Sequence, residues 1–178
     1  RLTWIGSNNP RHRISSAGTL EFPFGKGRRF GSNLHPVLNA IFGGWSTSHI
    51  VMWNSGPFLR WGQLNVTGDP IIDNPSPDKW FNTSAFAVAT PYTPRTNPWQ
   101  YPGLTGPGYW SWDGTLVKYF QLTERFRLEF RAEAYNAPNS FMLNQPNLSV
   151  TDARFGKSIG PAAGNFGREV QYTVRVHF

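Results

Sequence analysis

The sequence feature that most constrains the fold is a strict alternation of apolar and charged side chains in residues 125–136, RFRLEFRAEAYN. Successive side chains of a β-strand point to opposite faces, so a period of two predicts a strand with one apolar and one charged face. The charged face holds Arg127, Glu129, Arg131 and Glu133. The apolar face holds Phe126, Leu128 and Phe130, followed by two alanines.

Residues 167–178 repeat this alternation up to the final phenylalanine. Chain ends usually fray, so a regular strand at an end indicates a strand that is paired along its whole length. Arg175 lies on its polar face. The other face holds Val170, Tyr172, Val174, Val176 and Phe178.

Three further segments are predicted to be strands, namely 11–24, 44–60 and 109–122. A short helix is predicted over residues 36–42. Proline suits the first turn of a helix and glycine suits the position after its end, and Pro36 and Gly43 stand at these places.

The connections between the predicted strands differ sharply in length. About three residues join 109–122 to 125–136, whereas the loops 62–108 and 137–166 are long and polar. In an up-and-down antiparallel sheet, alternate connections lie at the same end of the strands. One end here therefore carries short connections and the other end carries long ones. Short turns on one side and long loops on the other are typical of transmembrane β-barrels.

The strand lengths and the aromatic residues point the same way. The predicted strands exceed the soluble norm of about 5–6 residues and match the about 9–11 residues of a tilted membrane strand. Tyrosine and tryptophan gather near strand ends, as they do in the girdles at a membrane interface. The sequence therefore predicts an all-β fold, an antiparallel up-and-down transmembrane β-barrel segment of about five strands of a larger barrel, with long extracellular loops.

This fold assigns an environment to each face of the two most regular strands. Lipid is expected to cover Phe126, Leu128, Phe130, Val170, Tyr172, Val174, Val176 and Phe178. The charged ladder, defined as Arg127, Glu129, Arg131, Glu133 and Arg175, is expected to line an aqueous lumen. An arginine turned towards lipid at the membrane midplane costs about 2–4 kcal/mol, so this penalty fixes the register.

Composition excludes several other classes of protein. The chain has no cysteine, which excludes a disulfide-stapled module and a thiolate metal site. The net charge of +7 is spread along the sequence rather than gathered into a patch, so no nucleic-acid partner is expected. No catalytic set of residues stands out, and the four histidines lack metal-ligand spacing, so we expect no enzyme activity, no metal and no cofactor.

The loop 62–108 is rich in aromatic residues, which have two interpretations. They are Trp80, Phe81, Tyr92, Trp99 and Tyr101. Such rings could stack on a sugar or heteroaromatic ligand, or they could pin the loop against the rim of its own barrel. The sequence leaves both interpretations open.

Several segments taken together, in order, resemble a known family. They are RISSAGTLEFPFGKGRRF, GGW, DKWFNTSAF, WDGTLVKYFQL, RFRLEFRAEAYNAPN and the strand ending in phenylalanine. Together they resemble the C-terminal barrel of TonB-dependent receptors, most of all the Oar-like group, whose full chains carry an N-terminal carboxypeptidase-regulatory-like domain and a plug.

The resemblance implies an outer-membrane receptor of a Gram-negative bacterium that takes up scarce ligands with energy passed from the inner membrane. Barrels of that class have about 22 strands around a plugged lumen. Residues 1–178 would then be a C-terminal fragment of the barrel. Its partners would be outer-membrane lipid, the remainder of its own barrel and plug, and the TonB system acting through parts outside this chain.

Two alternatives remain at this point. The first is a soluble, secreted β-sandwich that binds carbohydrate through exposed aromatic rings. The second is a passive, porin-like channel, which differs from a receptor in having no plug. The sequence does not identify a transported ligand.

Overall fold

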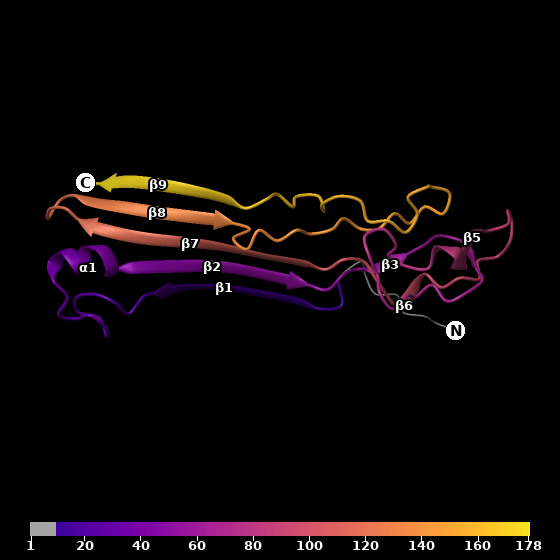
Figure 1. Ribbon diagram of the computed structural model, residues 1–178, viewed down its shortest axis with the longest axis horizontal. Helices are drawn as coiled ribbons and strands as arrows, with labels where there is room; N and C mark the ends of the chain where they lie inside the picture. The colour runs from indigo at the N-terminus through magenta and orange to yellow at the C-terminus, as the bar shows by residue number, and fades with distance from the viewer. Residues whose placement is uncertain (1–9) are drawn as a thin grey trace. The chain divides into compact units, whose positions relative to one another are not determined.

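The computed structural model describes residues 10–178, and its main feature is a five-stranded antiparallel sheet (Figure 1). The sheet has the order β1-β2-β7-β8-β9. Its strands are β1 (Arg13–Glu21), β2 (Trp45–Asn54), β7 (Tyr109–Gln121), β8 (Arg127–Tyr135) and β9 (Glu169–His177). Neighbouring strands run in opposite directions (Figure 1). The predicted all-β, antiparallel, up-and-down arrangement is therefore confirmed.

The chain divides into two compact units, which are described separately. The sheet unit comprises Ile14–Met52, Trp110–Ser140 and Phe166–Phe178. The loop unit comprises Trp53–Tyr109 and Phe141–Asn165, together with the described residues up to Arg13.

The register of β8 and β9 places polar side chains opposite polar ones and apolar side chains opposite apolar ones. Glu129 pairs with Arg175 across β8 and β9, and Phe130 pairs with Val174. The pairing of β8 with β9 runs without a break from Arg127 to Tyr135. Because the side-chain period is two, a slip of one residue would bring charged side chains onto the apolar face.

The ends of the strands differ from the predicted bounds for identifiable reasons. Strand β1 ends at Glu21, shortly before Pro23, which lacks the N–H that a strand pair needs. Strand β8 begins at Arg127, directly after a turn. In this turn the Thr123 hydroxyl accepts hydrogen bonds from the backbone N–H groups of Arg125 and Phe126, at 3.3 and 3.1 Å. It ends before Asn136, whose φ of +48° lies in the left-handed region.

The predicted strand 44–60 is wrong in its last third. Strand β2 ends at Asn54, and Phe58–Arg60 forms a separate strand, β3, that pairs with β6 (Gln100–Thr105). Gly56 lies between them, in contact with the backbone of Gly106: an added Cβ would lie 1.6 Å from the Gly106 carbonyl oxygen. This close backbone approach requires glycine and separates the two strands.

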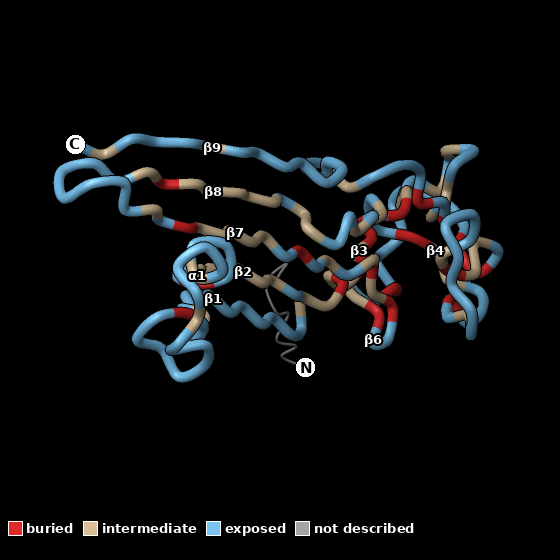
Figure 2. The backbone as a smooth tube through the Cα atoms, turned by 60° about the vertical axis from the view of Figure 1, so that its left-hand side comes forward, coloured by how far each residue is buried: buried red, intermediate tan, exposed pale blue. Residues whose placement is uncertain are grey.

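The segment predicted to be a long polar loop, 62–108, contributes most of a hydrophobic core that also includes Leu59 and Trp61. It contains β4 (Leu64–Val66) paired with β5 (Phe86–Val88), the short 3-10 helix η1 (Thr83–Ala85), and β6. The core residues are Leu59, Trp61, Leu64, Phe81, Ala85, Phe86, Tyr101 and Leu104. Figure 2 shows buried residues concentrated around β3, β4 and β6 and scarce on β1 and β9. The second long loop contributes Phe155, whose ring centroid lies 5.2 Å from that of Phe81.

The short helix predicted over 36–42 is confirmed as α1 (Pro36–Phe42). The His35 side chain accepts a hydrogen bond from the N–H of Val37 at 3.4 Å, and Pro36 occupies the first turn. The helix contains no buried residue. Among residues 10–178, no helix has the length and apolar character to cross a membrane.

Candidate functional site: the charged face of the sheet

The charged face of β8 and β9 is built around Glu129. One carboxylate oxygen accepts a hydrogen bond from Nε of Arg131 at 3.0 Å. The other lies 2.8 Å from Nε2 of His177, on the neighbouring strand. Because partners on both sides hold the carboxylate, its side chain is only 4% exposed although it lies on an open face of the sheet.

The rest of the charged ladder continues this network. Glu133 lies 3.7 Å from the guanidinium of Arg131, so Arg131 stands between two carboxylates. The Arg127 guanidinium lies 4.6 Å from the ring centroid of Tyr119 on β7. The structure therefore places all five ladder residues on one face of β8 and β9, and the network extends across that face to β7. Whether this face lines a lumen stays a prediction.

Tyr119 and His177 belong to this site, although the sequence did not single them out as functional. Their ring centroids lie 6.3 Å apart. In the sequence, both residues alternate with apolar ones and so fall on the polar side of their strands. Only the register places Tyr119 opposite Glu129 and His177 opposite Arg127. Each carboxylate of the network has at least one cationic neighbour, so the arrangement suits cross-strand stabilisation and charge display on the face rather than acid–base chemistry.

The opposite face of the same strands is apolar and exposed. Val174 is 62% exposed, and Phe126, Val170, Tyr172, Val176 and Phe178 are exposed as well. Leu128 and Phe130 are half-buried, and the Phe130 and Tyr172 rings stack with centroids 6.3 Å apart. A contiguous apolar face of this kind in a folded protein marks a surface that another phase or partner covers.

Lys118 on β7 interrupts the apolar face, a feature that the sequence prediction missed. It stands directly opposite Phe130 and is only 2% exposed. Its ammonium donates hydrogen bonds to the carbonyl oxygens of Ile41, at 3.3 Å, and Gly43. These oxygens lie at the C-terminal end of α1, where carbonyls lack helical partners and the helix dipole is negative, so they suit a cation.

Trp45 adds a second attachment between α1 and the apolar face. Its indole N–H donates to the same Ile41 carbonyl at 2.9 Å. Its ring lies 5.1 Å from the Lys118 ammonium and meets Phe130 edge-on at 6.2 Å. The C-terminal end of α1 is thereby fixed to the apolar side of the sheet.

The structure corrects part of the prediction for the loop aromatics. Phe81 is fully buried and Tyr101 is buried, so their rings are not available to a ligand. Both pack against Trp61, with ring centroids 5.2 and 5.6 Å away. Trp80 is half-buried, and its indole N–H donates to the Thr105 carbonyl at 2.7 Å. These three rings hold the loop unit together, because they pack against or bond to its own residues.

Only the remaining two of the five predicted rings are exposed. Tyr92 projects fully into solvent, and Trp99 is partly open with the Arg95 guanidinium 4.2 Å from its ring centroid. Arg95 is fixed by hydrogen bonds to the carbonyls of Trp61, Asn97 and Pro98. Trp99 and Arg95 thus form a rigid stacked pair on the surface of the loop unit.

A polar cavity of about 260 Å³ also lies in the loop unit. Its lining residues are Asn144, Gln145, Asn147, Arg154, Lys157 and Ile159. Hydrogen bonds from the side chain and backbone of Arg154, and from Asn147, lower the pKa of Asp152 to about 2. Asp152 thus stays ionised and fixes Arg154 at the cavity. Within residues 10–178, no group of three or more histidine or acidic side chains is arranged to hold a metal.

Comparisons with known proteins place the chain in a family. The outer membrane beta barrel domain family matches residues 6–171, which is nearly the whole chain. Searches of curated proteins and of solved structures returned no match.

Proposed function

Because the chain belongs to the outer membrane beta barrel domain family, and so to the bacterial outer membrane, we propose that it forms part of the barrel of a TonB-dependent receptor for ligand uptake. The observation that carries the proposal is the difference in length between the connections at the two ends of the strands in one antiparallel sheet. Residues 122–126 suffice to join β7 to β8, whereas residues 55–108, between β2 and β7, fold around a core of their own. Large, structured loops suit capture of a ligand better than free diffusion through a pore.

The proposal includes further strands outside this sheet. Strands β1 and β9 lie at its edges. An unpaired backbone group in hydrocarbon costs several kcal/mol, so both edges need partners within a membrane. The smallest membrane barrels have about 8 strands, more than the five seen here, so we propose that the remaining strands come from the rest of a longer chain.

The proposal assigns roles to the two faces and to the loop unit. The apolar face contacts outer-membrane lipid, and the charged ladder faces the lumen and the plug. Tyr92 and the Trp99–Arg95 pair are the loop groups open to a ligand, since they are exposed while Phe81 and Tyr101 are not. Nothing in the proposal requires a catalytic step. No finding supports the alternative of a soluble carbohydrate-binding sandwich.

The test uses the full-length protein, purified from outer membranes and inserted in a planar lipid bilayer in potassium chloride. A plugged receptor is expected to show no steady conductance until urea at a denaturing concentration displaces the plug, because the lumen is filled. It is also expected to bind the purified periplasmic domain of TonB in a calorimetric titration. Steady ohmic conductance without urea, together with no binding of that domain, would instead establish a passive channel.

A further inference from the structure

Helix α1 carries an apolar stripe that the described residues leave exposed. The stripe consists of four side chains that are 43–60% exposed, namely Val37, Leu38, Ile41 and Phe42. At 3.6 residues per turn, these four positions fall within about 140° of the helix circumference. In a soluble globular protein a stripe of this width faces the core. Here it faces away from the protein, because no residue of the helix is buried.

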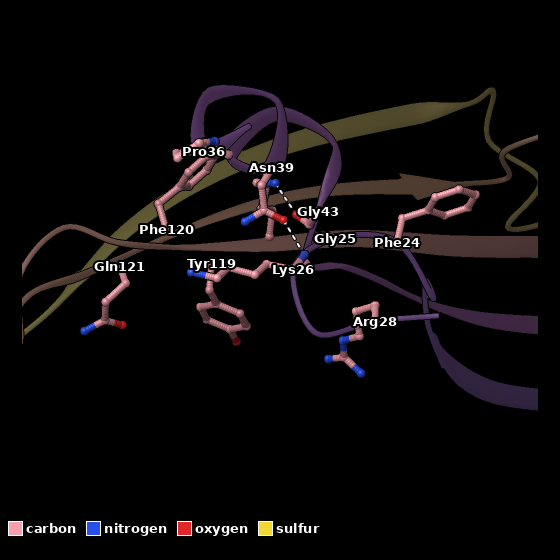
Figure 3. A pocket seen from close by; sticks show the side chains of 13 residues that line it. Phe24, Gly25, Lys26, Arg28, Pro36, Asn39, Gly43, Tyr119, Phe120 and Gln121 are labelled. Carbon is pink, nitrogen blue, oxygen red and sulfur yellow. Dashed lines mark hydrogen bonds between the residues drawn. The ribbon is translucent and has the colours of Figure 1, made fainter. Parts of the chain in front are cut away.

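The opposite side of α1 is attached to the connection between β1 and the helix. The Asn39 side-chain oxygen accepts a hydrogen bond from the backbone N–H of Lys26 at 2.6 Å (Figure 3). Gly25 has a φ of +118°, and an added Cβ would lie 2.8 Å from both Asn39 and Gly43. The connection therefore needs glycine to approach α1 this closely, and the contact holds the helix with its stripe outward.

Lys118 and Trp45 place α1 over the apolar face of the sheet. Lys118 stands directly opposite Phe130, on that face. Its ammonium donates hydrogen bonds to the carbonyl oxygens of Ile41 and Gly43, at the end of α1. The ammonium also lies 5.1 Å from the ring centroid of Trp45, whose indole N–H donates to the same Ile41 carbonyl at 2.9 Å. The helix is thus fixed to the apolar side of β7.

Neighbouring side chains separate between the two faces in the same way. Figure 3 shows Phe120 on the same side of β7 as Pro36 of the helix. Tyr119 and Arg28 lie on the other side of β7, the side of the charged ladder (Figure 3). Arg28 pairs there with Glu21 at 2.7 Å. Helix α1 itself contains no charged residue, so its exposed stripe continues the apolar face.

Helix α1 lies at the end of the sheet where the connections are short. Residues 122–126 join β7 to β8 at this end, and Figure 1 shows α1 beside the same end. Lys118 precedes the last residue of β7, Gln121, by three positions. At about 3.3 Å per residue and a tilt of about 45°, this is about 7 Å in depth from the end of the strand. Helices that lie in a membrane interface insert their apolar side by about 5–10 Å, which matches this depth.

We propose that α1 is an interfacial helix whose apolar stripe inserts into the periplasmic leaflet of the outer membrane. Bilayer lipid is the occupant, because the stripe is uncharged and continuous with the apolar face of the sheet. A helix of seven residues is marginal in isolation, but here the sheet holds it in place. The same contact keeps lipid away from the Lys118 ammonium, which is only 2% exposed. The inference rests on the assignment of the apolar face to lipid and not on ligand uptake.

The test measures what surrounds spin labels on α1 in the full-length protein, reconstituted in phospholipid vesicles. Residues 1–178 contain no cysteine, so Val37→Cys and Ile41→Cys each provide one labelling site in a protein whose other parts are kept cysteine-free. Oxygen collects in lipid and a nickel chelate collects in water, so the ratio of their collision rates with the label reports its surroundings. Both labels are expected to give the high ratio of a lipid-exposed site.

Two control positions define the scale. Val174→Cys lies on the apolar face of β9 and is expected to give the high ratio. Glu124→Cys lies in the exposed turn between β7 and β8, at the same end as α1, and is expected to give the low ratio of a site in water. A retained heat-dependent shift in electrophoretic mobility shows that a labelled variant is folded, and two positions on α1 keep the test valid if one variant folds poorly.

The possible results separate the occupants of the stripe. A ratio at Val37 and Ile41 like that of Glu124 overturns the proposal, because the stripe then faces water. Exclusion of both reagents also overturns it, because protein then covers the stripe. A low ratio at Val174 as well overturns the lipid assignment of the whole apolar face together with this inference.

Discussion

The assignment of the apolar face to lipid makes a quantitative prediction for Val174→Arg. Val174 is 62% exposed and lies next to Thr173, the central residue of β9. At about 3.3 Å per residue and a tilt of about 45°, it lies about 2 Å in depth from the middle of the strand. An arginine facing lipid at that depth costs about 2–4 kcal/mol, which lowers the ratio of folded to unfolded protein roughly 30- to 900-fold.

Gln171→Arg is the matched control, because it places the same residue on the same strand but on the other face. Gln171 stands opposite Glu133, so the new guanidinium meets a carboxylate and a small or favourable change is expected. The assay is equilibrium unfolding of the full-length protein in lipid vesicles with guanidinium chloride, followed by tryptophan fluorescence. On a water-facing surface, both substitutions would change stability by less than about 0.5 kcal/mol. Equal effects of the two variants would therefore refute the assignment of the faces.

Three further predictions concern the charged ladder and the loop unit. Glu129→Ala leaves Arg131 and His177 without their shared carboxylate; because both remain partly exposed, the expected cost is about 1–3 kcal/mol, below that of a fully buried pair, in the same unfolding assay. Phe81→Ala empties a fully buried site and is expected to destabilise the loop unit by about 3–5 kcal/mol, seen as faster proteolysis of residues 62–108 while the barrel keeps its heat-dependent shift in electrophoretic mobility. The pKa of Asp152 in the folded protein, about 2, lies below its ordinary value of 3.8, so its contribution to stability is present above about pH 4 and is lost as the pH falls towards 2. Hydrogen exchange of the amides in 147–157 is expected to quicken over that range in the native protein, and a response of the same size in Asp152→Asn would contradict this.

The regular strands could be predicted because their signal is local. In β8 and β9 the parity of each residue assigns it to a face, so the alternation was enough to predict which residues share a face; the residue-by-residue pairing from Arg127 to Tyr135 came from the structure. The end of β2 could not be predicted in this way. The contact between Gly56 and Gly106 joins residues fifty positions apart, and nothing in the apolar pattern near Phe58 records it.

The loop aromatics show the same limit for the candidate ligand site. Phe81 and Tyr101 were grouped with Tyr92 and Trp99 because all four are aromatic residues in one polar segment. Which of these rings pack together depends on the position of Trp61, and the alternation of apolar and polar residues does not predict that position. Aromatic content alone therefore could not separate rings that hold the loop together from rings that face solvent.

The sequence by itself determined the alternating strands, their antiparallel order, the short helix and the membrane class, because each of these follows from side-chain parity, turn residues and connection length. Only the tertiary structure decided that the long loop has its own core and that the ammonium of Lys118, within the apolar face, donates hydrogen bonds to carbonyls at the end of α1. Both depend on contacts between residues that are distant in sequence. Close packing and hydrogen-bond partners are set by distance in space, and a pattern with a period of two carries no information about it.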